Sequence, residues 1–320
     1  MEKDSYKVLV LHYSQTGQLT RVLESMLAPL EQAAPVEVTW QRLEPAEPYP
    51  FPWPVLRFME EFPEAVQLDP PPLAPLDVDP TTDYDLIVLG YTVWFLSPAP
   101  PMTAFLQSAT ARELLRDKPV ITVTACRNMW LTAQQTMRDL LAGLGARLCD
   151  HVAFVDGGPS LATFITTPRW LLTGNKGPWA GLPAAGIDDN DIQRRGTRLG
   201  RALRQALLAG EVTGKEPVLH GLEAVQVDEG LAMSERIGSR SFAIWSRLLR
   251  AAGPRGSLRR RLVLFIYVVF LLAMIITVVP LSLLIRRLLR PLPAQRLARL
   301  RAFHEQPSGS GRARVEEFDS

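Results

Sequence analysis

The sequence has 320 residues, of which 47% are hydrophobic and 21% are charged, a composition that suits one large domain with appendages. Its formal net charge of +2 gives no overall basic field, which argues against nucleic acid as a partner. The two cysteines, Cys126 and Cys149, have no metal-like spacing and indicate neither a disulfide framework nor a metal site.

Predicted strands and helices alternate along the first two thirds of the chain. Short apolar runs rich in β-branched residues predict strands at 6–11, 36–43, 85–90, 119–125 and 151–155. Apolar residues at helical spacing predict helices at 19–30, 103–115, 132–144 and 188–208. The alternation predicts a three-layer, doubly wound α/β domain with a five-stranded parallel sheet over residues 1–211.

Two insertions interrupt this plan. Residues 44–82 are rich in proline but also contain Tyr49, Phe51, Trp53, Phe58 and Phe62, which favours an ordered flap over a disordered loop. Residues 157–186 contain several apolar and aromatic side chains, namely Phe164, Trp170, Leu171, Leu172 and Trp179 beside Arg169. Long loops in compact domains are functional or disordered, and this apolar content indicates a lid.

The turn after the first predicted strand is a candidate phosphate site. It reads Ser14-Gln15-Thr16-Gly17-Gln18 and leads directly into a predicted helix. Hydroxyl donors, a glycine that allows close approach and the free N–H groups of a helix N-terminus suit a phosphate. The turn has no lysine, so it is not a nucleotide triphosphate P-loop and suits a single phosphate monoester. The alternative is an ordinary hydroxyl cap of the helix.

Two further loops leave the same expected edge of the sheet, where ligands bind in open α/β folds. The loop after the third predicted strand contains Tyr91, Thr92, Val93, Trp94 and Phe95, whose aromatic rings suit a flat heteroaromatic ligand. The loop after the fourth predicted strand contains Ala125, Cys126, Arg127 and Asn128. Domain packing is the alternative for the aromatic residues, and a buried structural role is the favoured interpretation for Cys126.

Together, these three loops resemble the flavin-contacting loops of the flavodoxin and NAD(P)H-quinone reductase superfamily. The resemblance implies FMN as cofactor, with the phosphate held by Ser14, Gln15, Thr16, Gly17 and Gln18. It implies a flavin ring between Thr92, Val93, Trp94 and Phe95 on one side and Ala125, Cys126, Arg127 and Asn128 on the other. The superfamily usually has Thr or Ser two residues after the glycine, where this chain has Leu19 followed by Thr20.

A narrower resemblance covers nearly the full length. The stretches LHYSQTGQLTR, PYPFPWPVLRF, ACRNMWL and TTPRWLLTG are similar to those of dialkylresorcinol condensing enzymes. Because a flavin accepts hydrides or single electrons, the flavin-compatible step of that pathway is oxidation of a dialkylcyclohexane-1,3-dione to the dialkylresorcinol. Arg127 would stabilise the enolate and Tyr91 would relay a proton. The alternatives are a membrane-bound NAD(P)H-quinone reductase and an electron carrier without an organic substrate.

The C-terminal third contains a candidate membrane anchor. Residues 262–285 carry no charge and are long enough at 1.5 Å per residue to exceed a hydrocarbon core of about 30 Å. We therefore expect a linker with an amphipathic juxtamembrane helix over 212–257, a single transmembrane helix over 258–290 and a polar, flexible tail over 291–320. The domain is expected in the cytoplasm with the tail outside. The expected partners are the membrane and a lipid-like small molecule, and a homodimer stays open.

Overall fold

The computed structural model describes residues 3, 5–214, 216–288 and 294–319. Its main sheet has the parallel strands β1 (Tyr6–His12), β2 (Val36–Arg42), β3 (Leu86–Tyr91), β6 (Pro119–Cys126) and β7 (Arg147–Val155). Their order across the sheet is β2-β1-β3-β6-β7. This is the order of the flavodoxin-like doubly wound fold, so the predicted fold class is confirmed.

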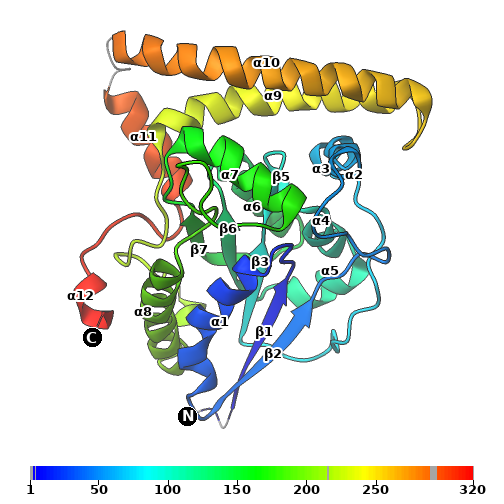
Figure 1. Cartoon of the computed structure of the whole chain (residues 1–320). Coiled ribbons are helices and arrows are strands. Elements are labelled where there is room, and N and C mark those ends of the chain that lie inside the picture. Colours follow the sequence, from blue (N-terminus) through cyan, green and yellow to red (C-terminus); the bar gives the residue numbers. More distant parts are fainter. Residues whose placement is uncertain (1–2, 4, 215, 289–293, 320) are drawn as a thin grey trace.

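Helices cover both faces of the sheet (Figure 1). The helices α1 (Gln18–Glu31) and α8 (Asp189–Leu208) pack on one face, around a core that includes Val8, Val10 and Val88. The helices α4 (Pro100–Leu106), α5 (Ala109–Leu115) and α6 (Leu131–Gly143) pack on the other face, around Leu9, Leu11 and Leu89. Alternate residues of β1 therefore point to opposite cores, as expected of a strand buried on both sides.

Most predicted strands and helices occur at the predicted positions, but one predicted helix is interrupted. The helix expected over 103–115 is two helices, α4 and α5, because the Ser108 side chain accepts a hydrogen bond from the Ala111 backbone N–H at 3.0 Å. A serine in this role begins a new helix rather than continuing the old one.

The two insertions are ordered, and their helices lie at the carboxyl edge of the sheet (Figure 1). The flap contains the short helices α2 (Val55–Glu60) and α3 (Phe62–Gln67), and the two-residue strands β4 (Val93–Trp94) and β5 (Ser97–Pro98) form a hairpin beside it. The lid contains the helix α7 (Ser160–Thr173), which the sequence analysis did not assign as a helix. The Trp53 backbone N–H donates to the Leu171 carbonyl at 2.9 Å, so flap and lid contact each other.

The C-terminal third returns to the domain. A long helix, α9 (Glu229–Ala252), runs across the carboxyl edge, and α10 (Leu258–Leu288) lies antiparallel along it (Figure 1). The chain continues as α11 (Ala294–Glu305) and ends with α12 (Val315–Phe318) beside α8. The expectation of a flexible tail therefore differs from the structure, because Phe318 and Ser308 are buried against the domain.

Two glycines allow α1 and α8 to pack at very short range. A Cβ atom on Gly200 would lie 2.0 Å from the Met26 carbonyl oxygen, and one on Gly196 would lie 2.4 Å from the Ser25 hydroxyl. The Ser25 hydroxyl also donates to the Ile192 carbonyl at 3.1 Å. Any larger side chain at Gly200 must push the two helices apart.

We expect Gly200→Ala to lower the free energy of unfolding by about 1–3 kcal/mol, because overpacking against backbone atoms cannot be relieved by a rotamer change. Thermal or urea unfolding of the full chain in detergent measures this. Gly143→Ala is the matched control, because a Cβ there has no neighbour within 4 Å. The expectation fails if both variants unfold like the parent chain.

Candidate functional site

The turn between β1 and α1 has the geometry of an anion-binding loop. Gly17 caps α1 in the left-handed region, with φ 77°, which favours glycine. Thr20 donates its backbone N–H to the Ser14 hydroxyl, and Gln18 donates its own to the Thr16 hydroxyl, both at 3.4 Å. The side-chain amide nitrogen of Gln15 is buried and has no hydrogen-bond partner among the described residues. The loop therefore presents a helix N-terminus, hydroxyl groups and one unused amide donor together.

The loop after β3 folds into the β4–β5 hairpin. Its two turn residues, Phe95 and Leu96, both have positive φ, at 50° and 65°. Backbone strain of this kind costs roughly 1–2 kcal/mol per non-glycine residue and tends to occur at functional sites. The Thr92 hydroxyl is buried without a partner among the described residues.

Trp94 is the centre of an aromatic cluster rather than a free platform. Its ring contacts those of Tyr13, Tyr49, Trp53 and Phe58 at centroid distances of 5.3 to 6.0 Å. Three of these rings belong to the flap, so the predicted ordered flap is held by aromatic packing. Phe95 continues the cluster through Phe58, at 4.9 Å.

Tyr91 lies in a buried polar network beneath the loop. Its hydroxyl donates to the Gln134 side chain at 2.8 Å, and Gln134 donates to Thr122 at 3.1 Å. Thr122 in turn contacts the His151 ring nitrogen at 2.9 Å. Burial raises the pKa of Tyr91 well above its ordinary value of 10. A phenol that already donates inside the core is poorly placed to relay a proton, which argues against the role expected for Tyr91 from the resemblance.

The loop after β6 contains a cation without a carboxylate partner. The Arg127 guanidinium stacks on the Phe164 ring of the lid, 3.9 Å from its centroid, and contacts the Met129 sulfur at 3.9 Å. Burial lowers its pKa to about 10, so it stays positively charged at neutral pH. Among the described residues it forms no ion pair, and a half-buried cation of this kind favours an anionic ligand nearby.

Cys126 and Asn128 flank this arginine. Burial raises the pKa of the Cys126 thiol above its ordinary value, which disfavours the thiolate that a nucleophile needs. The Asn128 side-chain oxygen is buried with no partner in the described part of the chain. Ala125, the last of the predicted residues in this loop, is part of the core on the α1 and α8 face.

One carboxylate joins the two ends of the lid. Asp156 accepts hydrogen bonds from the backbone N–H groups of Gly158 and Gly186, both at 2.8 Å. Gly186 is crowded, because a Cβ there would lie 2.7 Å from the Gln18 side chain and 2.8 Å from the Trp170 ring. Gln18 also donates to the Ile187 carbonyl at 3.2 Å. The end of the lid is therefore seated directly on the candidate phosphate loop.

Four segments at this edge carry buried polar atoms that lack a partner among the described residues. The three predicted loops each contribute one, and the lid helix contributes two: Gln15 Nε2, Thr92 Oγ1, Asn128 Oδ1, Thr166 Oγ1 and Thr167 Oγ1. An unsatisfied buried polar atom costs about 1–3 kcal/mol, so such a set favours a polar ligand that supplies the partners. The two threonines were not among the predicted site residues, although both lie in the stretch TTPRWLLTG.

A cavity of about 310 Å³ opens between the loop after β6, the start of the lid and α9. Asn128, Met129 and Asp156 line it, together with Glu235 of α9. Glu235 is 1% exposed; its Oε1 accepts from the Thr132 backbone N–H at 2.5 Å, and its Oε2 has no partner among the described residues. Burial raises the pKa of Glu235. Sequence reasoning missed this residue because it reaches the site from a helix more than 100 positions away.

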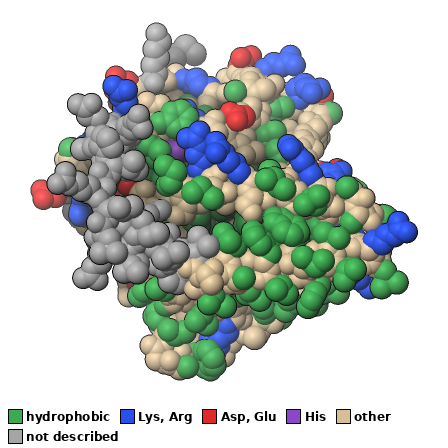
Figure 2. Space-filling view, turned by 90° about the horizontal axis from the view of Figure 1, so that it is seen from above, with side chains coloured by type: hydrophobic (Ala, Val, Ile, Leu, Met, Phe, Trp, Pro, Cys, Tyr) green, Lys and Arg blue, Asp and Glu red, His purple; other side chains and the backbone are tan. Residues whose placement is uncertain are grey.

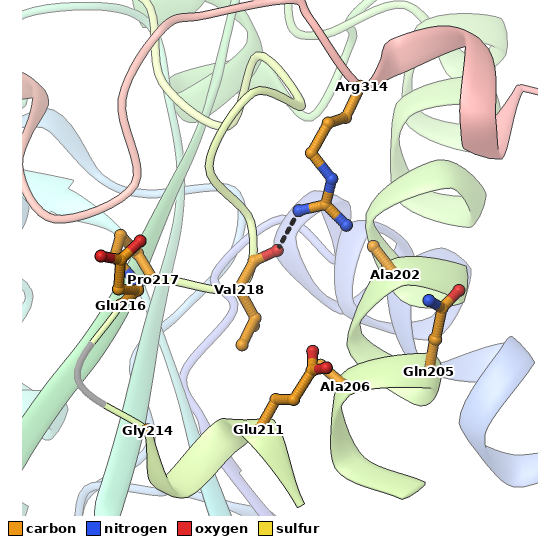
Figure 3. A pocket seen from close by; sticks show the side chains of 9 residues that line it. All are labelled: Ala202, Gln205, Ala206, Glu211, Gly214, Glu216, Pro217, Val218 and Arg314. Atoms are coloured by element: carbon orange, nitrogen blue, oxygen red, sulfur yellow. Dashed lines mark hydrogen bonds between the residues drawn. The ribbon is translucent and has the colours of Figure 1, made fainter. Parts of the chain in front are cut away.

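A second cavity, of about 320 Å³, lies at the opposite edge of the sheet (Figure 3). It is bounded by the end of α8 and by residues 211–214 and 216–218, where Arg147 at the start of β7 donates to the Gly214 carbonyl at 2.8 Å. Arg314 donates to the Val218 carbonyl at 3.0 Å across its mouth. Ligands of open α/β sheets bind beyond the carboxyl ends of the strands, so this cavity is not the candidate site.

No protein-family model matches the chain, and no curated protein matches it either. Among solved structures, a flavoprotein from Lactobacillus acidophilus NCFM in complex with FMN is 17% identical, with a TM-score of 0.38 over 47% of this chain and 93% of that chain. A flavodoxin from the domain Archaea is 11% identical, with a TM-score of 0.33 over 63% and 98%. An oxidoreductase from Corynebacterium diphtheriae is 13% identical, with a TM-score of 0.34 over 65% and 99%. At these scores the fold assignment rests on the observed strand order.

We expect Asp156→Ala to free the lid, because both of its ends lose a hydrogen bond to the same carboxylate. Limited trypsin digestion should cut faster after Arg169 and Lys176 in this variant. Asp79→Ala is the matched control, because Asp79 makes a similar turn contact to the Thr81 N–H at 2.9 Å outside the lid. Equal cutting of the two variants would show that Asp156 does not hold the lid.

Proposed function

We propose that the chain is an FMN-dependent oxidoreductase whose cofactor occupies the carboxyl edge of the sheet. The observation that carries this is the set of unsatisfied buried polar atoms in the three loops and the lid. In the proposal, Ser14, Gln15, Thr16, Gly17 and Gln18 hold the phosphate. The hydroxyls of Thr166 and Thr167 serve as further polar contacts from the lid.

The two remaining loops are proposed to contact the flavin ring. Thr92 and Val93 are half-buried and belong to the hairpin loop, whereas Trp94 supports that loop from within the aromatic cluster. Phe95 stands at the strained turn of the same loop. On the other side are Ala125, Cys126, Arg127 and Asn128. When bound, FMN would supply a two-electron acceptor for hydride.

We propose as substrate a cyclohexane-1,3-dione carrying alkyl chains, with the matching dialkylresorcinol as product. The ring loses two hydrogens in this reaction, one as a hydride to the flavin and the other as a proton to a base. The cavity beside Asn128 offers a buried carboxyl, Glu235, as that base. Arg127 offers a fixed positive charge for the enolate oxygen, an electrostatic role that works best where water is excluded.

The electrostatics favour this pairing of roles. Glu235 lines the same cavity as Asn128, the residue next to Arg127, so the base and the cation share one region. A carboxyl group with a raised pKa is better matched to proton transfer near neutral pH than an ordinary one. The apolar and aromatic side chains of the flap, α7 and α9 would cover a hydrophobic substrate ring. An electron carrier, by contrast, needs the edge of its flavin exposed.

We expect Gln15→Glu to reduce FMN binding at least tenfold, because it places a carboxylate beside a phosphate dianion, and tenfold corresponds to about 1.4 kcal/mol. The flavin content of the purified full chain and titration with free FMN measure this. Gln205→Glu, at the cavity of Figure 3, is the matched control and should keep its flavin. Retention of full flavin content by Gln15→Glu would exclude this loop as the phosphate site.

The reaction is tested by anaerobic mixing of flavin-loaded protein with a synthetic dialkylcyclohexane-1,3-dione. We expect the oxidised flavin absorbance to disappear as the resorcinol forms. If the dione leaves the flavin oxidised while NADPH and a quinone turn over, the chain is a quinone reductase. If neither pair of substrates reacts, it is an electron carrier.

In the same assay we expect Glu235→Gln to slow the reaction by about 10²–10⁴-fold, the usual contribution of a positioned base. The amide keeps an acceptor for the Thr132 N–H, so the fold and the flavin content should not change. Because burial raises the pKa of Glu235, the parent rate should fall as pH drops through a value above the ordinary 4.5. If Glu235→Gln keeps the parent rate and the same fall of the rate at low pH, Glu235 is not the base.

A further inference from the structure

Within the described residues, one helix, α10, is long and apolar enough to cross a membrane, with a mean hydropathy of 2.2 over Leu258–Thr277. Its 31 residues correspond to about 46 Å, more than the roughly 30 Å of a hydrocarbon core. Only 17% of that apolar window is buried in the chain's own structure, so most of its surface is available to another phase.

The start of α10 is fixed to the flap. Arg260 is 3% exposed and donates to the Glu64 carboxylate at 2.5 Å and to the Glu60 carbonyl at 3.1 Å. About two helical turns later, Tyr267 is fully buried and stacks on Phe62, with 4.4 Å between ring centroids. This end of the helix is therefore held on the same side as the α/β domain.

The segment that follows α11 is also fixed to that domain. Ser308 is fully buried; it donates to the Asp150 carboxylate at 2.7 Å and accepts from the His151 backbone N–H at 2.7 Å. Further on, Asp319 accepts from Arg198 of α8 at 3.1 Å. Both contacts join the tail to β7 and α8, which belong to the central α/β fold.

These two attachments are incompatible with a helix that crosses the bilayer once. A crossing would leave the tail on the far side, and the chain would have to pass back through the hydrocarbon before Ser308. The segment available for this is α11, which carries Arg296, Arg299 and Arg301. Each arginine at the bilayer centre costs at least about 2.5–3.5 kcal/mol, so α11 cannot make that return.

The exposed apolar side chains form one face, seen from above in Figure 2, where green side chains extend over α10 and its neighbours. They come from α10, α9, α7 and the flap around α2: Phe265, Ile266, Val269, Leu272, Ile276, Ile237, Ile244, Leu248, Leu161, Ile165, Val55 and Leu56. We call this set the apolar face. Monomeric soluble proteins rarely expose contiguous patches of this kind.

Exposed arginines lie beside the apolar face. Arg236, Arg240 and Arg247 of α9 form no ion pair with any carboxylate in the described part of the chain, and neither does Arg259. The sequence of α10 contains no acidic residue. Unpaired cations beside exposed apolar residues are typical of surfaces that lie in the headgroup region of an anionic membrane.

We propose that α10 lies in the plane of the membrane instead of spanning it, and that the whole apolar face enters one leaflet. The domain and the tail then stay on the same side. The lid helix α7 and the flap reach the lipid together with α9 and α10. This replaces the single-pass topology expected from the sequence, and it does not depend on the identity of the cofactor or the substrate.

Single-cysteine labelling tests this topology with the full chain in native membranes. Glu24→Cys reports the domain and Glu316→Cys reports the tail, and both positions are exposed. An impermeant maleimide should label both from one side of the membrane and neither from the other, with the parent chain as a blank for Cys126 and Cys149. Labelling of the two positions from opposite sides would overturn the proposal.

Depth of insertion is tested separately with an environment-sensitive fluorophore on Ile165→Cys, in the lid. On anionic vesicles its emission should shift to the blue, whereas the same fluorophore on Glu24→Cys should not shift. An unshifted Ile165 probe would limit contact with lipid to α10 and overturn the larger apolar face. A homodimer that covers Ile165 in the absence of lipid would also overturn it, since a second copy and not the bilayer would then be the partner.

Discussion

All five strands of the main sheet run parallel, and this constraint determines where everything else can be built. Each strand must be followed by a crossover on one face, so the loops after β1, β3, β6 and β7 all begin at the same edge. The helices of the flap, the lid and α9 all lie at that edge. None of these helices lies at the opposite edge. The irregular segments of the chain therefore lie mainly at the edge where the loops after the strands begin.

The sequence predicts the regular part of this arrangement well, because strand and helix periods are local properties. The run around Val8 and Val10 and the spacing of Leu19, Val22 and Leu23 each identify an element without any tertiary information. The turn from Ser14 to Gln18 was identifiable for the same reason, since its residues are adjacent. By contrast, Glu235 meets Thr132 across 103 positions, and Ser308 meets Asp150 across 158. No local pattern encodes such pairs.

Two errors have a shared physical origin. The lid helix contains Pro168 and two threonines, so its helical propensity is low, and it forms because Trp170 and its neighbours are buried against the flap and the phosphate loop. The tail is polar and contains glycine and serine, which is typical of disorder, yet its few buried side chains find partners in the domain. In both cases tertiary contacts outweigh propensity, as they often do for short segments.

The contact between Gly186, Gln18 and Trp170 affects how ligands exchange. Since the end of the lid rests on the turn before α1, movement of the lid would change the surroundings of any molecule held by that turn. The cavity beside Glu235 is lined in part by the start of the same lid, at Gly158 and Ser160, and by Asp156, which holds both ends of the lid. Movement of the lid would therefore change both compartments together. Lid opening on the microsecond to millisecond timescale would then limit exchange at both.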